Sequence, residues 1–127
     1  MPTDVIRHKR LIQDYFWPKS RYDCILGVWS LCYLHGEDLE TVLLRMQTSV
    51  KSSGSIVFME PVLKDESPAD EQEIAEKEAQ MKARKSRWYE QLFRQLDLQL
   101  LETRFHQRSN RLLTDVRVYV LKTGLQK

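Results

Sequence analysis

The chain has 127 residues, of which 42% are hydrophobic and 30% charged, and its net charge is +2. That length suits one domain, and the composition is that of an ordinary globular protein. Acids are interspersed with the bases, so the sequence excludes the basic stripe with which a protein binds nucleic acid. The longest apolar run, residues 24–34, is too short to cross a bilayer. Residues 1–12 lack the apolar centre and the cleavage site of a signal peptide.

The cysteines favour free thiols, with a disulfide or a metal site as the less favoured alternative. Cys24 and Cys32 both lie in apolar surroundings and do not form a Cys-x-x-Cys pair, so we predict buried, reduced thiols. The histidines, His8, His35 and His106, do not have the spacing of metal ligands, and we predict no metal. We therefore expect the protein in a reducing compartment, the cytoplasm or the nucleus or both.

Residues 22–29, YDCILGVW, predict the first strand. A near-continuous apolar run of this kind is typical of a strand buried on both faces of a parallel sheet. The acids Glu37 and Asp38 follow Gly36 and predict a helix start, where unpaired amides and the helix dipole favour negative charge.

An amphipathic helix of about 15 residues is predicted next, because apolar residues recur at helical spacing. They are Leu39, Val42, Leu43, Met46 and Val50. The segment KSSGS then predicts the end of this helix, with Gly54 in the left-handed cap conformation. Residues 55–61, SIVFMEP, predict a second strand, since β-branched and aromatic residues precede a proline. Residues 22–60 thus have the length of one right-handed β-α-β unit.

Residues 64–85 differ in kind, with seven acids and five bases and little apolar content. Glu73 with Lys77, and Glu78 with Lys82, would be favourable pairs at i,i+4 on a solvated helix. The alternative is a mobile charged insertion, which we favour. In either form we expect this segment to lie outside the core.

The C-terminal third predicts a helix that begins at Ser86 and then two strands. Residues 98–107, LQLLETRFHQ, form the first strand and residues 116–123, VRVYVLKT, the second. Strict alternation in the second strand predicts antiparallel pairing with the first. The predicted order is β-α-β-insertion-α-β-β.

This order resembles the C-terminal half of the class I S-adenosylmethionine-dependent methyltransferase fold, an α/β Rossmann-like sheet. Residues 12–34, IQDYFWPKSRYDCILGVWSLCYL, resemble without gaps a segment of the N-terminal protein methyltransferases. In that family a Leu-Gln-Asp-Phe turn leads into a Tyr-Asp-hydrophobic strand. SSGSIVFME and NRLLTDVRVYVLK are similar to the family's next strand and to its last hairpin. The resemblance implies a partial methyltransferase domain over residues 1–127, with strand order 4-5-7-6 and the last strand antiparallel.

These enzymes methylate the α-amine of proteins that begin Xaa-Pro-Lys, with S-adenosylmethionine as cofactor. The resemblance implies that Ile12 and Gln13 contact the adenine of this cofactor. Val28 stands where the family has a cofactor-binding glutamine, which leaves only a van der Waals wall. From the residues alone, Ile12 and Gln13 also suit a polar surface turn beside a core isoleucine.

The resemblance also implies a substrate site. Trp29 matches a tryptophan that lines the family's substrate pocket, and Glu60-Pro61 stands where an acid-asparagine pair binds the substrate amine. Tyr33 replaces a histidine proposed to help remove the amine's proton. A phenol, with a reference pKa of about 10, is a poor base at neutral pH. Plain aromatic packing is the alternative role for Trp29 and Tyr33.

Cofactor binding in this fold needs a glycine-rich turn, and the four glycines of the chain are scattered. The first three strands of a full family member have no counterpart, so we expect an exposed edge at residues 22–29 and no activity from the chain alone. Two hypotheses follow. The chain is a truncated form of an N-terminal α-amine methyltransferase, or it is a non-catalytic subunit that pairs with a partner chain through its exposed edge.

Overall fold

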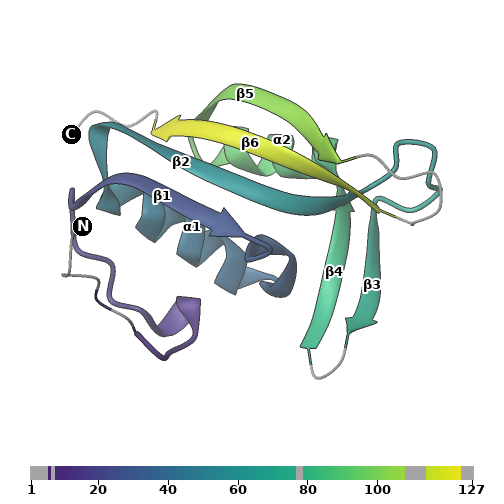
Figure 1. Cartoon of the computed structure of the whole chain (residues 1–127), viewed down its shortest axis with the longest axis horizontal. Coiled ribbons are helices and arrows are strands. Elements are labelled where there is room, and N and C mark those ends of the chain that lie inside the picture. The colour runs from purple at the N-terminus through teal and green to yellow at the C-terminus, as the bar shows by residue number, and fades with distance from the viewer. Residues whose placement is uncertain (1–5, 7, 77–78, 108–113, 124–127) are drawn as a thin grey trace.

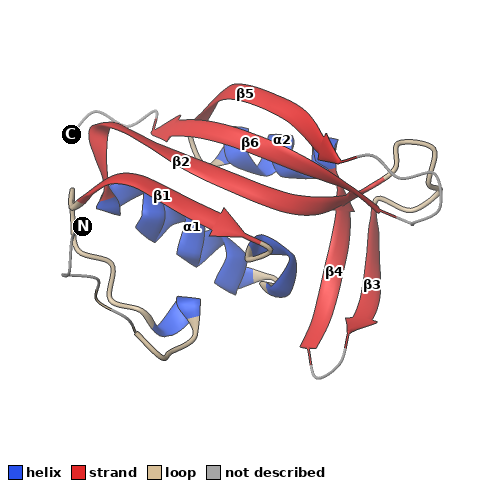
Figure 2. Ribbon diagram, in the orientation of Figure 1, coloured by secondary structure: helices blue, strands red, loops and turns tan. Residues whose placement is uncertain are grey.

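The computed structural model describes residue 6 and residues 8–76, 79–107 and 114–123. In this part of the chain a six-stranded mixed sheet carries two α-helices on one side (Figures 1 and 2). The elements in chain order are η1 (Ile12–Asp14), β1 (Tyr22–Val28), η2 (Leu31–Tyr33), α1 (Glu37–Ser49), β2 (Val50–Leu63), β3 (Glu71–Glu76), β4 (Ala79–Lys85), α2 (Ser86–Gln95), β5 (Leu98–Gln107) and β6 (Thr114–Thr123).

The long strand β2 is the centre of the sheet. β1 pairs parallel with it, in a register that sets Val28 opposite Met59. β6 pairs antiparallel along its other side, and β5 lies outside β6 (Figure 1). The order β1-β2-β6-β5 is the predicted 4-5-7-6 order, with the last strand antiparallel, and this prediction is confirmed.

The hydrophobic core lies between the sheet and the two helices. Alternate side chains of the central strands point into it, so that Ile56 and Phe58 of β2 and Tyr119 and Leu121 of β6 are completely buried. The helices contribute buried residues of their apolar faces, which are Leu39, Val42, Leu43, Met46, Tyr89, Leu92 and Phe93. No helix in the described ranges is long and apolar enough to cross a membrane.

The opposite face of the sheet is open at β1. Leu26 is 66% exposed and Val28 53%, whereas Ile25 and Gly27 on the helix side are buried. The prediction that β1 is buried on both faces is therefore wrong, because α1 and α2 both lie on one side of the sheet (Figure 2). For the same reason Cys24 is exposed, and only Cys32 is the buried thiol that was predicted; both are free.

The junction of α1 and β2 also differs from the prediction. β2 begins at Val50 directly after the helix, and Gly54 lies inside the strand rather than at a helix cap. A Cβ on Gly54 would lie 2.4 Å from the carbonyl oxygen of Asp23. A glycine is needed there because β1 and β2 approach closely, and not because the helix must end.

The charged segment forms a β-hairpin, so the helical interpretation of residues 64–85 is wrong for β3 and β4. In the antiparallel register Glu71 is opposite Arg84 and Glu73 is opposite Lys82. The charges that suit i,i+4 pairs on a helix therefore suit cross-strand pairs equally well.

The expectation that this segment lies outside the core is also wrong. Met81 and Ala83, two residues apart on β4, are buried on one face of the strand. Arg84 is also buried, although it is charged. β4 joins the sheet through parallel pairing of Arg84 and Lys85 with Val62 and Leu63 of β2, and the rest of the hairpin extends beyond the sheet (Figure 1).

Candidate functional site

The candidate site lies where the parallel strands β1 and β2 reach their carboxyl ends, the edge at which open α/β sheets bind ligands. The chain leaves β1 through residues 29–34, here called the exit loop. Trp29 opens this loop with a φ of 53°, and its backbone N–H donates to the carbonyl of Met59 at 2.9 Å. A bulky side chain at positive φ is uncommon, and such residues cluster at binding and active sites.

The carboxylate of Glu60 on β2 accepts hydrogen bonds from backbone amides of the exit loop. One carboxylate oxygen accepts hydrogen bonds from the backbone N–H of Ser30 at 3.2 Å and from its hydroxyl at 3.4 Å. The other accepts from the N–H of Cys32 at 3.2 Å. Burial raises the pKa of Glu60, and these hydrogen bonds to the charged form offset part of that rise. Both oxygens are thus engaged with the loop.

The guanidinium of Arg84 on β4 donates hydrogen bonds to backbone carbonyls of the same loop. Its Nη1 donates to the carbonyl oxygen of Leu31 at 3.2 Å, and its Nη2 donates to that of Leu34 at 2.8 Å. The sequence interpretation missed this residue, because Arg84 lay in the segment expected to be solvated. The spacing of Met81 and Ala83, alternating with Lys82 and Arg84, is the signal that could have found the strand.

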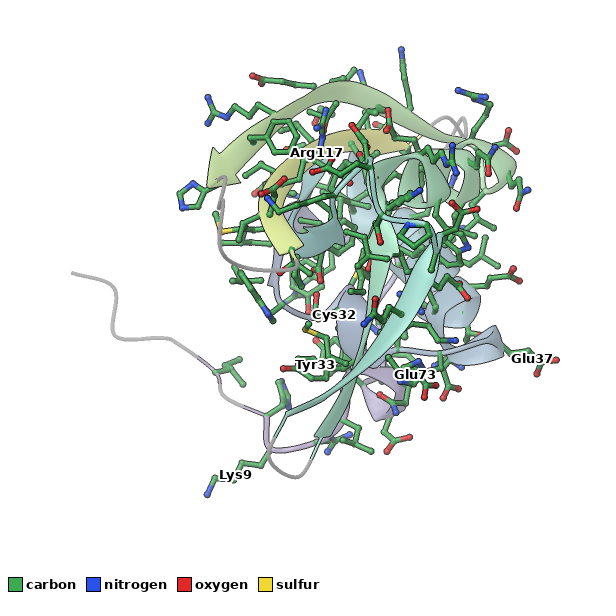
Figure 3. The ribbon with its side chains drawn as sticks, turned by 90° about the vertical axis from the view of Figure 1, so that its right-hand side faces the viewer. Lys9, Cys32, Tyr33, Glu37, Glu73 and Arg117 are labelled. Carbon is green, nitrogen blue, oxygen red and sulfur yellow. The ribbon has the colours of Figure 1, made fainter. Side chains whose placement is uncertain are left out.

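The exit loop places aromatic side chains against the hairpin. Trp29 and Tyr33 are half-buried and pack against a small cluster formed by Cys32, Leu63, Met81 and Ala83. Figure 3 shows Cys32 and Tyr33 next to each other beside the hairpin. Burial and the nearby Glu60 carboxylate raise the pKa of the Cys32 thiol, so it is not a ready nucleophile at neutral pH.

The other predicted site residues divide between two places. Val28 and Pro61 belong to β1 and β2, where Val28 is exposed and Pro61 is buried opposite Val116. Ile12 and Gln13 lie in η1, which packs against α1. Ile12 packs against the main core, and the backbone carbonyl of Gln13 accepts a hydrogen bond from Arg45 at 2.9 Å.

The structure therefore brings Trp29, Tyr33 and Glu60 together at one loop, and it attaches Ile12 and Gln13 to α1. Within the described residues, no group of three or more His, Cys, Asp or Glu side chains could hold a metal ion. What the exit loop offers chemically is a fixed aromatic surface beside buried hydrogen bonds. Such a surface can orient a ligand and exclude water from it.

Comparison with protein families gives a match over nearly the whole chain. The model of a family described as AdoMet-dependent proline dimethyltransferase, AdoMet being S-adenosylmethionine, matches residues 6–122. No curated protein matches significantly.

Solved structures with the same fold include S-adenosylmethionine-dependent methyltransferases. One from Leishmania major is 22% identical, with a TM-score of 0.71, over 87% of this chain and 42% of its own. The 1,6-didemethyltoxoflavin-N1-methyltransferase of Burkholderia thailandensis is 16% identical, with a TM-score of 0.69, over 88% of this chain and 48% of its own. One from Methanosarcina mazei is 8% identical, with a TM-score of 0.74, over 91% of this chain and 65% of its own. The chain thus spans less than half the length of the first two, and at these identities the likeness shows the fold.

Proposed function

This chain belongs to the family of AdoMet-dependent proline dimethyltransferases, and we propose from that premise that it is the substrate-binding part of an enzyme that methylates protein N-termini. The substrate is the α-amine of a protein that begins Xaa-Pro-Lys. The observation that carries this proposal is the exit loop, in which Glu60 fixes the segment that bears Trp29 and Tyr33 at the carboxyl edge of the sheet.

The chemistry asks for positioning rather than for a strong base. An α-amine has an unperturbed pKa of about 7.7 to 8.0, so part of it is already neutral at physiological pH. In-line transfer of a methyl group to such an amine is accelerated mainly when the amine is oriented and desolvated. Trp29 and Tyr33 supply a half-buried aromatic surface on which a proline ring can pack. In this proposal Tyr33 lines the site and does not remove the proton.

S-adenosylmethionine is the cofactor of the family and supplies the methyl group. The described residues fit one side of such a ligand, because Val28 offers an exposed apolar side chain at the end of β1. The described glycines lie singly, and no two of them form a glycine-rich turn. Gly27 and Gly54 are instead needed for the close packing of the strands. Calorimetry of the chain with S-adenosylhomocysteine should therefore detect no binding, and a micromolar dissociation constant would show that these residues suffice.

Calorimetry with peptides tests the substrate. A Ser-Pro-Lys peptide with a free α-amine should bind with a dissociation constant of about 1 mM or tighter, the range of weak specific ligands. The matched controls are the same peptide with an acetylated N-terminus and a Ser-Ala-Lys peptide. Equal binding of all three, or none by the free peptide, would reject the N-terminal substrate.

A second candidate function is a non-catalytic subunit that pairs with a partner chain. It is favoured by the free edge of β1, which in the described part pairs only with β2, and by the exposed Leu26 and Val28 on that strand. Such an edge and apolar face favour association with another chain.

Sedimentation of the purified chain tests this second candidate. Association through β1 predicts a concentration-dependent increase in mass that Leu26→Lys abolishes. Leu44→Lys is the matched control, since Leu44 is an exposed leucine (46%) of α1 and not of the strand. A monomer at every concentration would count against the interaction function.

A further inference from the structure

We propose that Arg84 is the positioning residue that ties the β3–β4 hairpin to the exit loop, so that the hairpin and the aromatic surface of Trp29 and Tyr33 act as one unit. The inference rests on the proposed function only where it assigns that surface to the substrate. The contacts of Arg84 with the loop stand by themselves.

The donors of Arg84 are directed at the backbone of the exit loop. The side chain is 1% exposed, although burying a charge is costly unless its hydrogen-bond donors are satisfied. Its two terminal nitrogens reach the carbonyl of Leu31, the first residue of η2, at 3.2 Å and that of Leu34, which follows η2, at 2.8 Å. The planar guanidinium can hold two acceptors at a fixed separation, which the single ammonium of lysine does not reproduce.

Two further elements hold the guanidinium in place. From α2, the ring of Trp88 lies 4.4 Å from its central carbon, and the hydroxyl of Tyr89 accepts a hydrogen bond from Nη1 at 3.2 Å. From β3, a carboxylate oxygen of Glu71 lies 3.8 Å from Nε, which has no hydrogen-bond partner within the described residues. Arg84 therefore links the exit loop to β3, β4 and α2 at one point.

Arg84 and Glu60 use different groups of the same loop. Glu60 accepts from the amides of Ser30 and Cys32, and Arg84 donates to the carbonyls of Leu31 and Leu34. Arg84→Lys alters only the hydrogen bonds at the carbonyls directly, so we expect the hydrogen bonds to Glu60 and the packing of α1 on the sheet to remain. We therefore expect the loop to open locally while the rest of the protein stays folded.

The buried thiol of Cys32 reports such an opening directly. In a Cys24→Ser background, which removes the exposed thiol, the reaction of Cys32 with an aromatic disulfide reagent is timed at low urea concentrations. Arg84→Lys should accelerate it by about tenfold or more, the factor for losing a hydrogen bond from a charged donor. The acceleration should not depend on urea, because a local opening exposes little surface.

Val42→Ala is the matched control, since Val42 is completely buried on α1 and its loss weakens the core instead. Its reaction rate at Cys32 should rise with urea, as global unfolding does. An unchanged rate in Arg84→Lys, or a rate that follows urea as in Val42→Ala, would overturn the proposal. Should Arg84→Lys fail to fold, Glu71→Gln is the second variant, because it keeps the guanidinium and removes its ion pair. It should accelerate the reaction of Cys32 by about twofold, the size expected for a partly exposed ion pair. An unchanged reaction rate in Glu71→Gln would also overturn the proposal.

The Ser-Pro-Lys peptide separates this proposal from the proposed function. If the wild-type chain binds the peptide, folded Arg84→Lys should bind it at least about tenfold more weakly, because the aromatic surface is no longer fixed. Equal binding by both would overturn the positioning role. If the wild-type chain does not bind while Cys32 still responds to Arg84→Lys, the peptide substrate is rejected and the tie between hairpin and loop remains.

Discussion

The end of β2 and the β3–β4 hairpin hold the same exit loop, but they are built very differently. β2 is the central strand, paired with β1 on one side and with β6 on the other. The hairpin joins the sheet through only two residue pairs of β4, and its other strand pairs are those between β3 and β4. Glu60 therefore acts from a rigid element and Arg84 from an attached one. Loss of Glu60 should cost stability, whereas loss of Arg84 should change the geometry of the loop.

The largest effect is expected on the β2 side, from Glu60→Ala. This change leaves the partly buried N–H of Ser30 and the buried N–H of Cys32 without an acceptor. The free energy of unfolding should fall by about 3 kcal/mol, since each unsatisfied buried donor costs about 1 to 3 kcal/mol. Urea unfolding measures it, with Glu66→Ala as a control because Glu66 is exposed. A loss no greater than that of the control would show that Glu60 does not hold the loop.

A smaller loss is expected from Gly27→Ala, which presses on the loop from β1. The new Cβ would lie 2.6 Å from the hydroxyl oxygen of Ser30 and 2.8 Å from a ring carbon of Phe58. Overpacking of this kind should lower the free energy of unfolding by about 2 kcal/mol, although alanine is intrinsically better than glycine in a strand. Thermal unfolding checks it beside Ser53→Ala, at an exposed position of β2. A stabilised Gly27→Ala variant would mean that the loop can move away freely.

The smallest effect is a pH dependence that belongs to Glu60 alone. Because its pKa is raised in the folded protein, the folded state holds this proton more tightly than the unfolded state. The stabilisation is complete below the ordinary pKa, about 4.3, and is lost as the pH rises through the raised value. Between pH 4.5 and 7 the unfolding free energy of the wild type should thus fall relative to that of Glu60→Gln. A difference that is constant over this range would contradict the raised pKa.

The sheet could be predicted because its signals are local. Runs of apolar residues gave β1 and β2, helical spacing gave α1, and alternation gave β6. Glu60 could be singled out only through the resemblance, because it stands where the family has the acid of an acid-asparagine pair.

The hairpin could not be predicted from its charges, since Glu73 and Lys82 suit a helix surface and a cross-strand pair alike. The burial of Arg84 depends on carbonyls of Leu31 and Leu34, some fifty residues earlier in the chain. The open face of β1 could not be predicted either, because an apolar run does not indicate which face of the strand is covered. Ile12 and Gln13 remain predicted cofactor residues, held against α1 in this structure.

The most direct test of the exit loop as the substrate surface is a titration of the tryptophan indole N–H signals by nuclear magnetic resonance. The chain has three tryptophans, and Trp29→Phe identifies the signal of Trp29. The free Ser-Pro-Lys peptide should shift the Trp29 signal progressively and leave that of Trp17 in place, while the acetylated peptide shifts neither. A Trp29 signal that stays unmoved while the peptide binds elsewhere would contradict the account.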